Sequence, residues 1–238
     1  MKPITIIRNV IFLLLFSLII PTSAGVYISI KEVTDPTSIY IINGCAMLAG
    51  CLFLLLIIQK SRFHFKEIGF RKGTLGLWIF PLLFIEAVPF IAGLNKDISL
   101  SSFMALCFFM VCVGIFEEGI FRGILFQYLK RINLSTAIWG SAILFGLGHS
   151  ANLLSGKSMT LTVAQILFAF LFGFVAAEIV ALTGSLQWVI IWHAVHNIVD
   201  QMTSGQTPVA MQMLLLSIQC IILLVISVVL WRKLRMLN

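Results

Sequence analysis

Charged side chains are scarce in this sequence. Lysine, arginine, aspartate and glutamate make up 11% of its 238 residues, whereas hydrophobic residues make up 60% and the mean hydropathy is +1.08. A soluble domain carries about 25% charged residues, so the composition excludes an ordinary soluble protein and indicates a polytopic membrane protein. The net charge of +7 is explained by loop charges that set the orientation in a membrane. No nucleic-acid partner is therefore expected.

The sequence also lacks the motifs of several hydrolase classes. It has no His-Glu-x-x-His of the zincin type, no Gly-x-Ser-x-Gly turn that would pair a serine with a histidine, and no Gly-x-Gly-Asp of the aspartyl type. It has no internal repeat, which disfavours carriers built from repeated halves. Its cysteines lie in apolar runs without metal-ligand spacing, and we interpret them as packing residues. They are Cys45, Cys51, Cys107, Cys112 and Cys220.

Eight apolar stretches predict an all-α fold, a polytopic membrane protein with about eight transmembrane helices and a polar intramembrane site. A span needs about 20 residues. The stretches are residues 1–30, 39–58, 75–94, 103–129, 136–154, 161–182, 186–202 and 209–231. The first resembles a signal peptide around Pro21-Thr22-Ser23-Ala24, but its apolar character continues to residue 30, which favours a transmembrane helix. Two prolines, Pro81 and Pro89, predict kinks in the third stretch.

The basic residues are divided unevenly between the loops. With the N-terminus inside, twelve of them lie on the inner side and three on the outer side. The inner residues are Lys2, Arg8, Lys60, Arg62, Lys66, Arg71, Lys72, Lys130, Arg131, Arg232, Lys233 and Arg235, and the outer residues are Lys31, Lys96 and Lys157. Because basic residues favour the cytoplasmic side, this division predicts that both termini are cytoplasmic.

Three ionisable residues interrupt the fourth apolar stretch. Glu117, Glu118 and Arg122 follow a run without any charge, although a charged side chain at bilayer depth costs a few kcal/mol or more. On a helix, Glu118 and Arg122 share a face and can pair, whereas Glu117 points about 100° away. Two interpretations follow. The pair is a structural lock between helices, or Arg122 holds Glu118 and leaves Glu117 free for chemistry.

The later stretches contain polar residues that a membrane helix does not need. His149 lies in the fifth, and His193, His196, Asn197 and Asp200 occupy positions i, i+3, i+4 and i+7 of the seventh. This is the spacing of one helix face, and such a polar stripe needs a polar partner surface. At about 1.5 Å per residue, Glu117, His149 and His193 lie about 18, 20 and 12 Å from the cytoplasmic ends of their helices. These depths are compatible with one site.

Two chemistries are compatible with this set of side chains. His149, His193 and Glu117 have the donor atoms of a divalent metal site, such as one for Zn²⁺. The same residues are equally suited to hold a water molecule between a glutamate base and imidazole donors. The residues alone leave both chemistries open.

In this order on three separate spans, the polar residues form motifs that resemble the signature of a protein family. The motifs are Glu117-Glu118-x-x-x-Arg122, Phe145-x-x-x-His149 and His193-x-x-x-Asn197, flanked by Phe121-Arg122-Gly123 and by Leu182-Thr183-Gly184-Ser185-Leu186. They are similar to those of the CAAX protease and bacteriocin-processing (Abi) family of intramembrane endopeptidases. The resemblance covers residues 103–204 and divides the chain into N-terminal helices (1–102), a catalytic core (103–204) and a C-terminal helix with a basic tail (205–238).

The resemblance implies a role for each motif residue. Glu117 is then the general base that activates water, and Glu118 and Arg122 support it. His149 and His193 then position water or a metal, or stabilise the oxyanion.

Further implications concern the rest of the site. Asn197 completes it, while His196 lies outside the motif and leaves open which imidazole of the seventh span points inward. Members of the family are described both as metalloproteases and as metal-independent glutamate proteases, so zinc stays open. The expected partners are the lipid bilayer and a membrane-associated peptide or protein. The expected location is a multi-pass position in a bacterial cell membrane, with a role in peptide maturation or bacteriocin self-immunity.

Two other functions are weighed against this one. A proton-coupled transporter would use the intramembrane acids as relay groups, namely Glu86, Glu117, Glu118, Glu178 and Asp200. A non-catalytic immunity protein would keep the motifs but only bind a membrane partner.

The charge division predicts the topology in a testable form. Reporter fusions after Asn238 and within residues 95–102 are expected to report opposite sides of the membrane, the first cytoplasmic. Two fusions that report the same side would contradict the eight-span topology.

Overall fold

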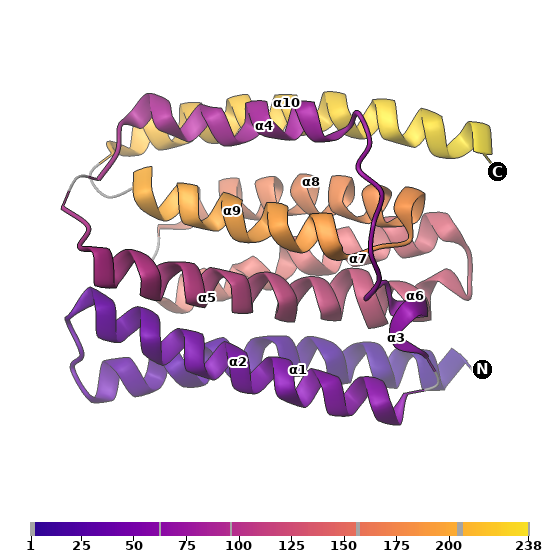
Figure 1. Ribbon diagram of the computed structural model, residues 1–238, viewed down its shortest axis with the longest axis horizontal. Helices are drawn as coiled ribbons and strands as arrows, with labels where there is room; N and C mark the ends of the chain where they lie inside the picture. The colour runs from indigo at the N-terminus through magenta and orange to yellow at the C-terminus, as the bar shows by residue number, and fades with distance from the viewer. Residues whose placement is uncertain (1–2, 62, 96, 156–157, 204–206, 238) are drawn as a thin grey trace.

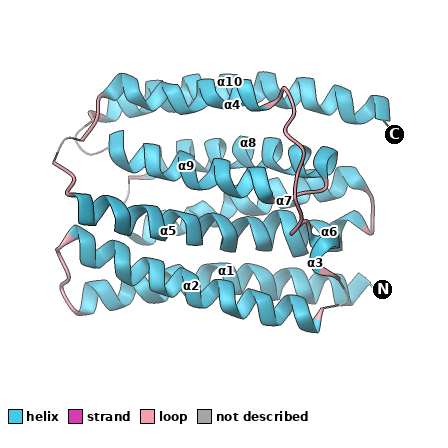
Figure 2. Cartoon of the chain, viewed as in Figure 1, coloured by secondary structure: helices cyan, strands magenta, loops and turns pink. Residues whose placement is uncertain are grey.

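The computed structural model describes residues 3–61, 63–95, 97–155, 158–203 and 207–237. Within these ranges the protein is built from helices and contains no strand (Figure 2). The predicted all-α class is therefore confirmed.

The helices follow one another with short connections. They are α1 (Pro3–Ile30), α2 (Pro36–Lys60), α3 (Phe65–Ile68), α4 (Ile79–Ala87), the 3₁₀-helix η1 (Val88–Ala92), α5 (Leu100–Glu118), the π-helix η2 (Gly119–Leu125), α6 (Phe126–Lys130), α7 (Leu134–Gly148), the 3₁₀-helix η3 (His149–Ser155), α8 (Met159–Thr183), α9 (Gln187–Thr203) and α10 (Val209–Leu237).

The longer helices run along a common axis in one bundle (Figure 1). α1 and α2 form one side, α4 and α10 form the opposite side, and α5, α7, α8 and α9 lie between them. The main helix pairs are α2 with α5, α7 with α8, α8 with α10, and α5 with α9. Both termini lie at the same end of the bundle, but which side of the membrane they face stays a prediction. Of the counted basic residues, Lys2, Arg62, Lys96 and Lys157 lie outside the described residues.

Five of the described helices are long and apolar enough to cross a membrane, so this is an integral membrane protein. They are Ile4–Ile30, Pro36–Lys60, Leu100–Lys130, Met159–Thr183 and Val209–Leu237. The other three predicted spans correspond to shorter helices at residues 79–92, 134–148 and 187–203. All eight predicted segments are thus helical, but three of them are shorter than a full span. The division into three parts at residues 102 and 204 stays a prediction.

The third predicted span is shortened by its prolines. Residues 75–78 precede the helix, and Pro81 lies in the first turn of α4, where a missing N–H removes no helical hydrogen bond. No kink is therefore needed at Pro81. Pro89 lies at the start of η1, where the α-helix changes into a 3₁₀-helix. Only the second proline marks a change in the helix.

The basic segment after α2 holds the turn that leads into α9. Nε of Arg71 donates to the carbonyl oxygen of Gly184 at 2.8 Å, and Oγ of Ser185 donates to the carbonyl oxygen of Arg71 at 2.5 Å. The backbone N–H of Leu186 donates to the carbonyl oxygen of Gly69 at 2.8 Å. Gly184 has φ 65°, a left-handed conformation that favours glycine at a helix end. These contacts fix the start of the helix that carries the polar stripe.

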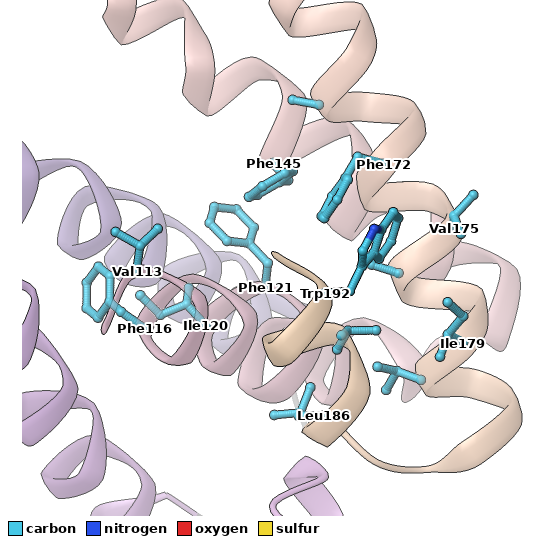
Figure 3. Packing of buried hydrophobic residues seen from close by; sticks show 14 of the residues in the cluster. Val113, Phe116, Ile120, Phe121, Phe145, Phe172, Val175, Ile179, Leu186 and Trp192 are labelled. Carbon is cyan, nitrogen blue, oxygen red and sulfur yellow. The ribbon is translucent and has the colours of Figure 1, made fainter. Parts of the chain in front are cut away.

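Aromatic side chains surround the centre of the bundle. The rings of Phe121 and Phe145 meet edge to face at 5.2 Å, and those of Phe172 and Trp192 stack at 3.9 Å. Figure 3 shows the first pair facing each other beside α5 and η2, with the second pair on α8 and α9. The polar residues of the fourth and seventh spans therefore lie close to aromatic side chains at the centre of the bundle.

The close contact between α5 and α9 depends on Gly114. A Cβ atom at this position would lie 2.9 Å from the backbone oxygen of Ile190, which cannot move without moving α9. We expect Gly114→Ala to lower the stability by about 1–3 kcal/mol, the usual effect of overpacking. The measurement is thermal unfolding of the purified protein in detergent.

The matched control is Gly25→Ala in α1, where an added Cβ meets nothing within 4 Å. This variant should unfold at the wild-type temperature or slightly above it. An unchanged unfolding temperature for Gly114→Ala would contradict the close helix contact.

Candidate active site

Three buried polar side chains meet through one carboxylate oxygen. Oε1 of Glu118 accepts a hydrogen bond from Nη1 of Arg122 at 2.9 Å and another from Nδ1 of His193 at 2.8 Å. Glu118 and Arg122 are fully buried, and His193 is 4% exposed. The predicted pairing of Glu118 with Arg122 is present, and it also reaches the stripe of α9.

A π-helical turn places Arg122 inside the bundle. The residue lies in η2, directly after Glu118 ends α5, and such turns often occur at functional sites. Its guanidinium carbon lies 4.0 Å from the ring centre of Phe145, a cation–π distance. Gly173 of α8 leaves room for it, because a Cβ there would collide with Nη2 of Arg122. Among the described residues, Nε and Nη2 have no hydrogen-bond partner. The ring of Phe145 and the carboxylate of Glu118 therefore stabilise the positive charge of the guanidinium.

Glu117 has a different environment from its neighbour. Its side chain is 25% exposed, and its Oε2 lies 3.7 Å from Nε2 of His193. The two nitrogens of that imidazole are therefore turned toward the two glutamates. Because Nδ1 donates to Glu118, the neutral ring carries a lone pair on Nε2. A water molecule between Nε2 and Glu117 would contact both groups.

His149 is oriented by the backbone of its own helix. Its Nδ1 donates to the carbonyl oxygen of Phe145 at 3.0 Å, at the point where α7 changes into η3. Its Nε2 is therefore the nitrogen available for chemistry, as in His193. The two rings lie 4.9 and 5.8 Å from the ring of Phe145, so both imidazoles pack against this phenylalanine.

The polar stripe of α9 lines a cavity of about 410 Å³, together with His149. His149, His193, His196, Asn197 and Asp200 all contribute to its wall. The structure thus brings both motif histidines and Asn197 to one space. Glu117 lines a neighbouring cavity that shares Phe145 and His149 with the first.

The structure assigns the two histidines of α9 to different carboxylates. Nδ1 of His196 lies 3.2 Å from both oxygens of Glu86 in α4, and Nε1 of Trp192 donates to Glu86 at 2.8 Å. His193, not His196, contacts the glutamates of the fourth span. The partnership with Glu86 was missed at the sequence level, where its one signal was a lone carboxylate in an apolar stretch. A further carboxylate, Glu178, is fully buried with no hydrogen-bond partner among the described residues.

The predicted metal ligands do not form a metal site as they stand. Among the described residues no group of three or more His, Cys, Asp and Glu side chains is placed to hold a metal ion. The imidazoles of His149 and His193 have suitable chemistry, since each Nδ1 is held by an oxygen acceptor and each Nε2 is available. Oε2 of Glu117 and Nε2 of His193 lie 3.7 Å apart, close to the roughly 3.3 Å that separates two tetrahedral ligands of one zinc ion, each about 2 Å from it. Zinc stays a prediction, and no chemical step is derived through it.

One comparison with known proteins bears on these residues. Residues 99–199 match the model of a family described as type II CAAX prenyl endopeptidase Rce1-like. The resemblance predicted from the motifs is thereby confirmed for this part of the chain, which contains all six predicted site residues. No curated protein and no solved structure gives a significant match.

The buried pair of Glu118 and Arg122 predicts that removal of Arg122 destabilises the protein. Arg122→Ala would leave Glu118 buried without its partner, and breaking a buried pair costs roughly 3–5 kcal/mol. We expect much less protein in membranes, measured by quantitative immunoblotting. Lys130→Ala, which removes an exposed cation at the end of the same helical segment, should accumulate normally.

A double variant separates stability from activity. Glu118→Gln combined with Arg122→Met removes both charges, so accumulation should recover while activity stays low. Normal accumulation of Arg122→Ala alone would contradict the proposed pairing.

Proposed function

We propose that this protein is an intramembrane endopeptidase in which Glu117 activates a water molecule to hydrolyse a peptide bond. The family match at residues 99–199 indicates a protease that works in a membrane. The observation that carries the finer proposal is the placement of His193 between two glutamates, one fully buried and one partly exposed.

The chemistry divides between the residues as follows. Glu117 accepts a proton from water, and the hydroxide attacks the carbonyl carbon of the peptide bond. The C–N bond then breaks, and the proton on Glu117 passes to the leaving nitrogen. Glu118 and Arg122 hold His193 in position. Each imidazole donates Nε2–H to the oxyanion only after it has taken up a second proton from solvent, so that Nδ1–H and Nε2–H are both present; His193 and His149 keep this proton while the bond is cut, and Asn197 contacts the substrate.

The substrate is a membrane-associated peptide or protein with an accessible backbone. Helical hydrogen bonds protect peptide groups in lipid, so the bond that is cut lies in an unwound segment or near the interface. We propose peptide maturation or bacteriocin self-immunity as the role, with both termini in the cytoplasm of a bacterial cell.

The general-base role of Glu117 predicts that replacing its carboxylate by an amide slows cleavage strongly. Glu117→Gln keeps the shape of the side chain but cannot accept a proton, so cleavage should fall by about 10²–10⁴-fold. The measurement is quantitative mass spectrometry of membrane and secreted peptides from cells with wild-type or variant protein. Asp97→Asn, in an exposed loop, is the matched control and should give the wild-type peptides.

The same experiment distinguishes the alternatives. If Glu117→Gln accumulates normally and leaves every peptide unchanged, the protease assignment is wrong. Loss of a proton-coupled flux, or of protection from a bacteriocin, without any change in peptides would favour the transporter or the partner-binding protein.

The two histidines of α9 should differ in importance. His149→Ala and His193→Ala are each expected to lower the cleavage rate by about 10²–10³-fold, the usual effect of losing an oxyanion donor. His196→Ala should be milder, because His196 contacts Glu86 instead. The reverse order would mean that His196 is the residue at the reaction centre. Metal analysis of the purified protein completes the test, since stoichiometric zinc with inhibition by chelators would assign the imidazoles to a metal.

A further inference from the structure

A groove of about 700 Å³ leads along α1 to Glu117. One wall belongs to α1, and the other belongs to α5, η2, α7 and η3. The lining residues are Ser17, Leu18, Pro21, Thr22, Gly25, Val26 and Ser29 on the first wall and Glu117, Phe121, Phe145, Gly148, His149, Ala151 and Asn152 on the second. We call this space the α1 groove.

Two glycines line open parts of the α1 groove. A Cβ atom added to Gly25 or Gly148 would meet nothing within 4 Å. In contrast, a Cβ at Gly44, Gly50 or Gly114 would lie within 3 Å of a neighbouring helix. Those three glycines allow close helix packing, whereas Gly25 and Gly148 face empty space from opposite walls.

The helix that forms the first wall is little enclosed by the other helices. Among the described residues of α1, only Leu13 and Ala24 are buried, and the helix lies at the edge of the bundle beside α2 (Figure 1). Because few of its side chains are enclosed by other helices, α1 separates the α1 groove from lipid by a single layer.

We propose that the α1 groove binds an extended segment of the substrate, which reaches Glu117 from the bilayer between α1 and α7. This inference rests on the proposed protease function. The α1 wall runs from Ser17 to Ser29, about 18 Å along the helix. An extended chain advances about 3.3 Å per residue, so the groove accommodates about five residues.

The chemistry of the walls fits an unwound peptide. A chain that leaves its helix in lipid needs partners for its exposed N–H and C=O groups. Thr22 and Ser29 offer hydroxyl groups on one wall, and Asn152 offers its amide oxygen on the other, since its Nδ2 donates to Gln165 at 2.8 Å. Phe121 and Phe145 supply apolar surface for the side chains of the substrate. A hydrocarbon chain would offer these polar groups no hydrogen bond.

The position of the bond that is cut follows from the two cavities. The α1 groove and the cavity of about 410 Å³ both include Phe145 and His149. Glu117 lines only the first and His193 only the second, yet their side chains approach to 3.7 Å. The reacting carbonyl lies where the two spaces meet. The groove runs toward the end of α1 that lies away from both termini, which is the outer side in the predicted topology.

The experiment fills the α1 groove without disturbing the bundle. Gly25→Ala, Gly25→Leu and Gly25→Trp form a size series, and Gly148→Leu fills the same space from the opposite wall. The control is Ser23→Leu, an exposed position on α1 that does not line the groove. The readout is the amount of each membrane or secreted peptide that depends on Glu117, together with accumulation and thermal unfolding of each variant.

We expect the Glu117-dependent peptides to decrease with the size of the side chain at position 25. The decrease should reach at least about 10-fold for leucine, comparable to one or more misplaced substrate contacts, while accumulation and unfolding temperature stay at wild-type values. Ser23→Leu should leave the peptides unchanged.

Three results would overturn the proposal. If Glu117→Gln removes peptides but the position-25 series does not, the substrate does not pass through the α1 groove, although the protease function stands. If the series releases a co-purifying lipid and leaves the peptides unchanged, the groove is a lipid site. If no peptide depends on Glu117, the protease function and the groove proposal fail together.

Discussion

The fully buried guanidinium of Arg122 is the constraint on which the centre of this protein depends. An unpaired charge in such a setting would cost several kcal/mol, so the surrounding elements must supply its partners at fixed positions. Glu118 contributes a carboxylate at 2.9 Å, Phe145 contributes a ring face at 4.0 Å, and Gly173 leaves the space that the side chain fills. Since Glu118 also accepts from His193, α5, η2, α7, α8 and α9 are all fixed by this one group.

This arrangement gives two adjacent glutamates different tasks. Both hydrogen bonds that Oε1 of Glu118 accepts come from side chains of the protein itself, so Glu118 orients Arg122 and His193. Glu117 lines a groove and is partly exposed, so its carboxylate is accessible from that groove. Two like residues in sequence thereby take different environments, one enclosed by the protein and one open to a groove, and the imidazole of His193 lies between them.

The parts that could be predicted from sequence are those set by spacing along one helix. The interval of four between Glu118 and Arg122 predicts their pairing, and long apolar runs predict most of the bundle. The polar stripe of α9 shows where this reasoning ends. It predicts one shared face, but His193 turns to Glu118 while His196 turns to Glu86, because two different elements pack against that face. Which helix lies opposite each residue is a tertiary property, and the π-helical turn at Arg122 has no signal in the residue pattern.

The central claim is that Glu118 acts on catalysis through His193, and a double-mutant cycle tests this most directly. The rate of forming Glu117-dependent peptides is measured for Glu118→Gln, His193→Ala and the double variant, each corrected for protein amount. If the two residues act as one unit, the double variant should be no slower than His193→Ala alone, because contacts of this kind are strongly non-additive. Effects of the two substitutions that simply multiply would contradict this account.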